Sequence, residues 1–193
     1  SDTKKPLEGL IVHRVKVEKG PLRRGDRVVC SVDREKRLST MRNHTATHLL
    51  HSALRNIVGE HVKQSGSYVA SDRLRFDFTH FHSLDKRTLE ALEDDVYGNI
   101  LRNEEVKTEV METAKAMESG VTALFGEKYG DTVRVLTIGD ISAELCGGTH
   151  VGATGDIGLF KIISEGSVAS GLRRIEAFTG RGAFRRLREE EDE

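Results

Sequence analysis

Residues 39–59 read STMRNHTATHLLHSALRNIVG, and the spacing of their apolar side chains predicts the central helix of the fold. Ser39 is a favourable N-cap, because its hydroxyl can accept a hydrogen bond from a free backbone N–H at the start of a helix. Gly59 follows the last residue of the pattern and is typical of a helix end. We therefore expect one helix that runs from Ser39 to about Val58.

The two sides of this helix differ in composition. At about 100° per residue, one side carries the apolar residues Leu50, Leu54 and Ile57. Nearly opposite, three histidines and an arginine gather within about 60° of one another, namely His44, His48, His51 and Arg55. An apolar back and a histidine front predict that the front faces something other than the main core.

The rest of the chain combines short β-like segments with one further helix. RLRFDF, residues 73–78, alternates apolar and charged side chains and is typical of a half-buried strand. Residues 85–103 carry apolar side chains at helical spacing, with Asp85 as the N-cap. Further strands are predicted at 106–111, 132–138, 157–163 and 172–178. Without regular βαβ alternation, this predicts an α+β fold with a mostly antiparallel sheet and two long helices.

The chain is expected to divide into three parts. Two Val-rich stretches, residues 10–17 and 27–32, precede the central helix and are joined by a connection with strong turn signals. The expected parts are a small β-barrel-like module at 1–38, a core at 39–180, and a charged helix start or frayed tail at 181–193.

Composition restricts the possible functions. The 193 residues carry a formal net charge of -1, so binding of nucleic acid would need a local basic patch rather than bulk charge. Hydrophobic side chains make up 37% of the chain, enough for one core. The polar first residues and the lack of a long apolar span predict no secretion or membrane insertion. We expect Cys30 and Cys146, far apart in the sequence, to be thiols in a cytoplasmic protein.

Two pairs of residues share the spacing of metal ligands. His44 and His48 are four residues apart on one helix, so both rings can reach one ion. Cys146 and His150 are also four apart, around two glycines that favour a tight loop. Either pair alone is common by chance, but together they suit Zn²⁺ better than Mg²⁺ or Ca²⁺. His51 could replace a helix ligand on geometry, although we interpret it as a neighbour of the ligands or a solvent-facing side chain.

Four motifs carry a resemblance to a known family. They are GPLRRGDRV at 20–28, RNHTATHLLHSALR at 42–55, LRFDFTH at 74–80 and ELCGGTHVGATGDIGLFKIISEGSVASGLRRIEAFTG at 144–180. Together they closely resemble the editing domain of bacterial alanyl-tRNA synthetase and the free-standing AlaX-like aminoacyl-tRNA deacylases. The editing domain of threonyl-tRNA synthetase is similar in its ligand pairs. It carries a bulkier, proline-containing insert between cysteine and histidine and lacks the N-terminal β-module, so the alanyl type is favoured.

The resemblance implies an activity: hydrolysis of mischarged Ser-tRNA(Ala) and Gly-tRNA(Ala) at a zinc-containing editing site. A synthetase needs such a site because one hydroxyl or methyl group gives only about 1–3 kcal/mol of discrimination. We find no ATP-dependent activation domain and no GxxxxGK[ST] loop in the chain. The chain is either a fragment, with the remaining synthetase domains as partners, or a free-standing deacylase. Its charged end at 181–193 resembles the start of a linker helix and favours the fragment.

The resemblance also implies roles for four residues near the metal. Gln64 lines the editing pocket, the alternative being a surface amide, and Gly66 lets the backbone approach the substrate. Thr47 either offers its hydroxyl to a serine substrate or bonds back to its own helix. Arg173 lies near the terminal nucleotide of the tRNA, where a guanidinium can meet a phosphate.

Other charged residues have simpler interpretations. Arg174, on the opposite strand face from Arg173, is predicted to form a solvent ion pair. Glu144 and Asp140 lie near the metal loop but are typical of structural carboxylates, so we assign no general base. Attack assisted by the zinc site or by the neighbouring ribose hydroxyl stays open. Three arginines could extend a phosphate-binding patch, although each alone is typical of a solvated side chain: Arg42, Arg73 and Arg75.

Two alternatives to this activity stay open. A zinc-stabilised module that binds tRNA without catalysis is favoured by the full set of four ligands and by the lack of a base. An editing enzyme for Ser-tRNA(Thr) would use the same kind of site. Deacylation assays on both tRNAs separate the three possibilities.

Overall fold

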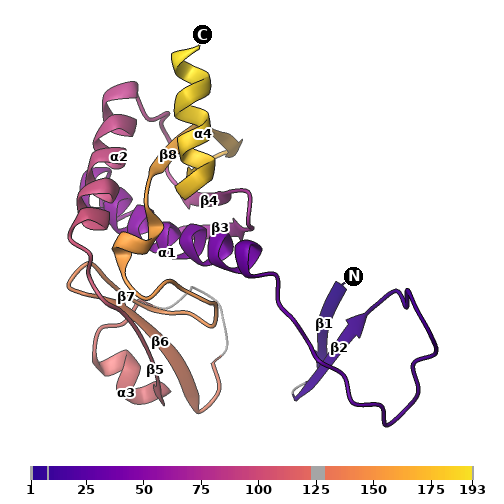
Figure 1. The fold of residues 1–193 in the computed structure, drawn as a ribbon. Coiled ribbons are helices and arrows are strands. Elements are labelled where there is room, and N and C mark those ends of the chain that lie inside the picture. Colours follow the sequence, from indigo (N-terminus) through magenta and orange to yellow (C-terminus); the bar gives the residue numbers. More distant parts are fainter. Residues whose placement is uncertain (1, 8, 123–128, 193) are drawn as a thin grey trace. The chain divides into compact units, whose positions relative to one another are not determined.

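Figure 1 shows the computed structural model, which describes residues 2–7, 9–122 and 129–192. The chain divides into two units, Ser1–Val32 and Asp33–Glu193. This boundary precedes the one predicted between residues 38 and 39, because the long helix begins earlier than its sequence pattern suggested.

The N-terminal unit contains a β-hairpin. Strands β1 (Asp2–Leu7) and β2 (Leu10–Arg14) pair antiparallel. Residues 27–32, predicted as a strand, have no regular structure, and none of the described residues pairs with them. A strand needs a hydrogen-bonded neighbour for its backbone groups, so the prediction fails where no neighbour is present. Within the described residues, the predicted barrel-like module is a two-stranded hairpin.

Helix α1 (Arg34–Ile57) runs through the centre of the second unit. The predicted start at Ser39 is wrong: Asp33 is the N-cap, and its carboxylate accepts a hydrogen bond of 3.0 Å from the backbone N–H of Lys36. Aspartate caps as well as serine does, and good helix formers follow it, so the helix starts a turn sooner. Gly59 ends the helix as predicted, with a φ of +136° that favours glycine.

A four-stranded antiparallel sheet forms the main core against the apolar side of α1. Its order is β3 (Gln64–Val69), β4 (Leu74–Thr79), β9 (Leu172–Thr179) and β8 (Phe160–Ala169). The alternation predicted for β4 is confirmed, since every second residue is buried: Leu74, Phe76 and Phe78. The helix residues Leu49, Leu50 and Leu54 are fully buried in the same cluster.

Two further helices cover this core. Helix α2 (Lys86–Leu101) has the predicted N-cap, because the carboxylate of Asp85 accepts a hydrogen bond of 2.8 Å from the N–H of Thr88. The charged segment after β9 forms a helix, α4 (Gly180–Glu191), rather than a frayed end. No helix within the described ranges is long and apolar enough to cross a membrane.

A second, smaller sheet lies on the other side of α1 (Figure 1). It pairs β5 (Val106–Glu112), β6 (Thr132–Ile138) and β7 (Ser142–Leu145) antiparallel, and α3 (Thr113–Glu118) contacts β5 and β6. The short 3₁₀ helix η1 (Thr154–Ile157) follows on the way to β8. On the histidine front of α1, His48 and His51 both bond to Glu144 of β7, so the front does face something other than the main core, as predicted; these two rings are buried.

A buried amide ties α1 to the main sheet next to the first predicted ligand. The side chain of Asn43 donates a hydrogen bond of 2.7 Å to the carbonyl of Ala70, in the turn after β3. It accepts one of 2.6 Å from the hydroxyl of Thr179, at the end of β9. These bonds fix the position of α1 relative to the main sheet at Asn43, the residue before His44.

Asn43→Ala is therefore expected to destabilise the fold by about 1–3 kcal/mol, because it removes the partner of the buried Thr179 hydroxyl and of the partly buried Ala70 carbonyl. Urea unfolding followed by circular dichroism measures this change. Asn56→Ala, an exposed asparagine on the same helix, is the matched control and is expected to have little effect. Equal unfolding free energies for the two variants would contradict the anchoring role of Asn43.

Candidate metal centre

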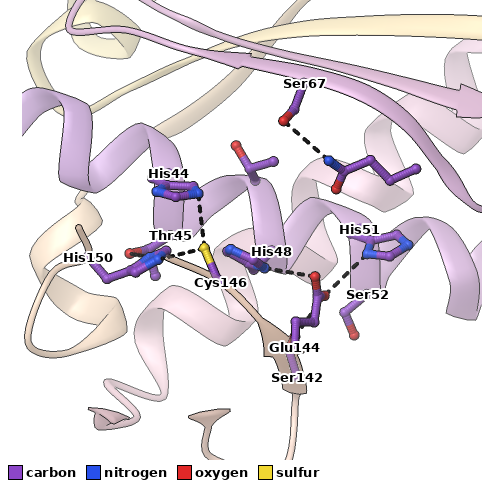
Figure 2. Close-up of polar contacts among 12 residues, drawn as sticks. His44, Thr45, His48, His51, Ser52, Ser67, Ser142, Glu144, Cys146 and His150 are labelled. Carbon is purple, nitrogen blue, oxygen red and sulfur yellow. Dashed lines mark hydrogen bonds and ion pairs between the residues drawn. The ribbon is translucent and has the colours of Figure 1, made fainter. Parts of the chain in front are cut away.

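Four side chains from two segments converge at the front of α1. His44 and His48 project from consecutive turns of the helix, and Cys146 and His150 come from the loop after β7. One ligand atom from each lies within 4.8 Å of the others. Figure 2 shows the four side chains turned toward one another. The two sequence pairs predicted to act together are thus one cluster in the fold.

The spacing within this cluster fits a tetrahedral metal. The sulfur of Cys146 lies 3.4 Å from Nε2 of His44 and 3.3 Å from Nε2 of His150. Zn–S and Zn–N bonds of about 2.3 and 2.0 Å at a tetrahedral centre place sulfur and nitrogen roughly 3.5 Å apart. Three imidazoles and a thiolate are also the donor types that zinc prefers.

The hydrogen bonding of His48 leaves one ring nitrogen for a metal. Its Nδ1 lies 2.9 Å from a carboxylate oxygen of Glu144. An ionised carboxylate only accepts, so Nδ1 carries the hydrogen and Nε2 of the neutral ring holds a lone pair. That Nε2 is buried and forms no hydrogen bond with any described residue. A buried nitrogen without a partner is costly, and a metal ion would satisfy it.

His150 is oriented in a similar way from the helix. Its Nδ1 lies 3.2 Å from the hydroxyl of Thr45, which also accepts a bond of 3.3 Å from the N–H of Val151. Thr45 is fully buried between the two turns of α1 that carry His44 and His48. It therefore fixes both the ring of His150 and the backbone that carries it.

The two glycines of the loop have different roles. A Cβ built on Gly148 would overlap Cε1 and Nδ1 of His44, so only glycine leaves room for that ring. A Cβ on Gly147 would meet nothing within 4 Å. The guanidinium of Arg134 donates to the carbonyls of Cys146 and Gly148, which holds the loop against β6.

The charges of the cluster favour metal binding. Burial alone would raise the pKa of the Cys146 thiol, but its contacts with His150, His44 and His48 lower it to about 3. The sulfur is therefore a thiolate, the form that binds metals, at neutral pH. Burial would likewise raise the pKa of Glu144, yet its two histidine partners hold it well below its usual range. His48 is the exception: burial lowers its pKa, but the neighbouring Cys146 and Glu144 raise it to about 9, so a metal ion would have to displace a proton from Nε2 at neutral pH.

The cluster opens onto a cavity of about 430 Å³ between α1, β3 and β6. Gln64 and Thr47 both line this cavity, together with Ser67. The amide Nε2 of Gln64 donates to the hydroxyl of Ser67 at 3.3 Å. The hydroxyl of Thr47 donates to the carbonyl of Asn43 at 2.8 Å, which is the backbone bond considered as its alternative. A lone pair of this hydroxyl is still able to accept from a bound group.

The other two residues expected near the substrate are not among the described residues that line this cavity. Gly66 pairs with Asp77 on β4 and is not among the described residues that line the cavity. Arg173 donates two hydrogen bonds of 2.6 Å to Glu165, and its side chain is 12% exposed. Its guanidinium is thus paired with Glu165, and its place near the terminal nucleotide of the tRNA stays a prediction.

The remaining arginines are also engaged. Arg174 forms a two-bond ion pair with Asp77, at 2.7 and 2.8 Å, which confirms the predicted ion pair. Arg42 donates to the carbonyl of Asp156 at 2.9 Å. Arg73 and Arg75 both lie beside the ring of Tyr68, with ion-pair partners on the same sheet. Asp140 pairs with Arg102, away from the cluster.

Sequence reasoning assigned no role at this centre to three residues that support it. Glu144 lies two residues before Cys146, so the end of a strand there would turn both side chains to the same side. Thr45 lies between the two helix ligands, and its buried position on α1 was not apparent from the periodicity. Gly148 was expected only to shape the loop, whereas it also makes room for His44.

Comparisons with known proteins show which sequences the chain is similar to. The family described as threonyl and alanyl tRNA synthetase second additional domain matches residues 133–176. An alanine–tRNA ligase of Desulfosudis oleivorans is 55% identical over 190 residues, covering 98% of this chain and 22% of that protein. An alanine–tRNA ligase of Thermotoga maritima is 58% identical over 181 residues, covering 94% of this chain and 21% of that protein. An alanine–tRNA ligase of Myxococcus xanthus is 55% identical over 193 residues, covering 100% of this chain and 22% of that protein. The chain spans about a fifth of the length of these curated relatives.

Proposed function

Because the chain belongs to the alanyl-tRNA synthetase family, whose editing domain it resembles over nearly its whole length, we propose that it is a proofreading deacylase. Its substrates are Ser-tRNA(Ala) and Gly-tRNA(Ala), and its product is free tRNA with the released amino acid. Serine has one hydroxyl more than alanine, and glycine has one methyl less. The aminoacylation site of a synthetase discriminates such differences by only about 1–3 kcal/mol.

The observation that carries this proposal is the contact between the four-ligand cluster and a cavity that polar side chains also line. His44, His48 and Cys146 line the cavity of about 430 Å³ from one side. Gln64 and Thr47 line it from β3 and from α1. A metal-ligand set beside a cavity lined by apolar surface and a few converging polar groups is the usual candidate for an active site.

The reaction is hydrolysis of an ester. The oxygen of water bonds to the carbonyl carbon, the bond from that carbon to the ribose oxygen breaks, and the ribose oxygen takes a proton. His44, His48, Cys146 and His150 would hold zinc, which when bound can polarise the carbonyl, activate water or hold the amino group.

The protein groups in the cavity suit the two ends of the substrate. The amide of Gln64 can turn its Nε2 from Ser67 to the ester carbonyl oxygen, where it stabilises the charge that develops on attack. The hydroxyl of Thr47 uses its hydrogen on Asn43, so it can accept a hydrogen bond from the hydroxyl of a bound serine. Alanine offers no such donor, and the site would therefore favour serine.

Gln64→Ala is expected to lower kcat/KM for Ser-tRNA(Ala) by about 100-fold, since one donor to a developing oxyanion is lost. A time course of ester hydrolysis with labelled serine on tRNA(Ala) measures this. Ser65→Ala is the matched control, because Ser65 is the exposed neighbour of Gln64 and is not among the described residues lining the cavity. A folded Gln64→Ala protein that clears the ester at the wild-type rate would overturn the assigned role.

One observation favours a second candidate, a zinc-stabilised module that binds tRNA without hydrolysis. Four protein ligands fill a tetrahedral zinc and leave no free position for water. The same time course decides between them: a protein that binds tRNA(Ala) but leaves the ester lifetime unchanged is such a module. Running Ser-tRNA(Thr) in parallel tests whether the tRNA preference follows the alanyl type. The remaining synthetase domains are the proposed partners that present the acceptor end.

A further inference from the structure

Glu144 is a buried carboxylate that links two histidines of the same helix. One oxygen lies 2.9 Å from Nδ1 of His48, and the other lies 3.2 Å from Nδ1 of His51. The hydroxyl of Ser142, on the same strand, donates to the second oxygen at 2.9 Å. The residue is only 9% exposed. Burying a charge is costly unless it is paired, so this position needs a function or a compensating network.

The two histidines differ in what their other side faces. Nε2 of His48 points into the four-ligand cluster, whereas His51 lies outside it and lines a second hollow with Ser52 and Arg55. The ring of His51 packs against Phe76, with centroids 5.3 Å apart, and is 5% exposed. His51 is thus fixed by Phe76 of the core and by Glu144, and Figure 2 shows its contact with Glu144.

We propose that Glu144 and His51 form a positioning unit that sets the ring orientation of His48. His51 and Ser142 hold one oxygen of the carboxylate, which directs the other oxygen at Nδ1 of His48. His48 then has one tautomer and one ring plane, with Nε2 toward the metal position. This inference rests on the proposed zinc site. It explains why α1 carries a third histidine, His51, that is not a member of the four-ligand cluster.

The unit acts on the metal through a ligand rather than on the substrate. Outer partners of this kind orient the imidazole and raise its basicity, and their loss weakens metal binding by about 10- to 100-fold. The same effect is expected from Glu144→Gln, because the amide turns a donor toward one of the two histidines. His51→Leu is expected to weaken zinc binding less, since Ser142 still holds the shared oxygen.

Zinc affinity of the whole chain, measured by competition with a chromophoric chelator, tests the inference. We expect Glu144→Gln to raise the zinc Kd by about 10- to 100-fold. His51→Gln, whose amide can still donate to Glu144, should bind zinc more tightly than His51→Leu. The d–d spectrum of the Co²⁺-substituted protein should change with Glu144→Gln. Asp140→Asn removes a neighbouring exposed carboxylate that contacts no ligand and should leave the Kd unchanged.

The outcomes separate this inference from the proposed function. If the wild type binds zinc and Glu144→Gln binds it equally well with the same Co²⁺ spectrum, the positioning unit is overturned while the metal site stands. If the wild type itself binds no zinc, the metal site falls, and the inference falls with it. A rise in Kd for Glu144→Gln with unchanged thermal unfolding in chelator supports positioning over a merely structural role.

Discussion

Cys146→Ala is expected to raise the zinc Kd by about 100-fold or more, because one of four ligands carries a share of the roughly 10–16 kcal/mol of structural zinc binding. The loss is larger than for a histidine, since the sulfur is the only anionic ligand of the cluster. Burial would raise the pKa of this thiol, but contacts with three histidines lower it to about 3. The wild-type sulfur is therefore already a thiolate at neutral pH. Deacylation of Ser-tRNA(Ala) should fall with zinc content.

Cys30→Ala is the matched control for this variant. Cys30 is exposed in the N-terminal unit and is also a free thiol. Zinc-to-protein ratios after dialysis against a weak chelator compare the two variants directly. Retention of stoichiometric zinc by Cys146→Ala, or its loss from Cys30→Ala, would show that the metal is held elsewhere. A zinc-free Cys146→Ala protein that still hydrolyses the ester would separate the metal from the chemistry.

The two pairs of the cluster, His44 with His48 and Cys146 with His150, were predictable because the spacing within each pair is local. His44 and His48 share a helix face whatever the rest of the fold does, and glycines between Cys146 and His150 permit the inward loop. The alternating pattern of β4 was equally direct, since Phe76 and Phe78 face one core. Such short-range patterns depend on few other contacts.

Residues whose roles depend on distant contacts were harder to predict. Gln64 reaches the cavity only because the edge strand β3 passes over α1, and its site role came from the family resemblance. The same resemblance implies a place for Arg173 near the tRNA, which stays a prediction, whereas its bond to Glu165 arises from the pairing of β8 and β9. The residue pattern within one strand does not show that an arginine forms an ion pair with a residue of the neighbouring strand.

Short elements were missed where propensity is weak. β3 reads QSGSYV, and β7 spans only SAEL, so neither shows the run of branched residues typical of strands. Both exist because neighbouring strands supply hydrogen bonds. The burial of His51 has the same origin: its carboxylate partner is provided by β7, which the sequence pattern did not predict.

Gly148→Ala is expected to disable the metal site without removing any ligand. A Cβ at this position would overlap the ring of His44 at Cε1 and Nδ1. The ring has to leave its place, and displacing one ligand should raise the zinc Kd by roughly 100-fold. The carbonyls of Cys146 and Gly148 are fixed by Arg134, so the loop has little freedom to move aside instead.

Gly147→Ala is the matched control, because the same methyl group, one residue away, meets nothing within 4 Å. Chelator competition should give this variant the wild-type zinc Kd. Because both substitutions stiffen the same loop, the difference between their zinc Kd values reports the clash with His44 alone. If both variants bind zinc like wild type, the ring of His44 has another allowed position, and its place as a ligand is wrong. If both lose zinc, the loop needs glycine for its backbone freedom, and the clash with His44 is not the cause.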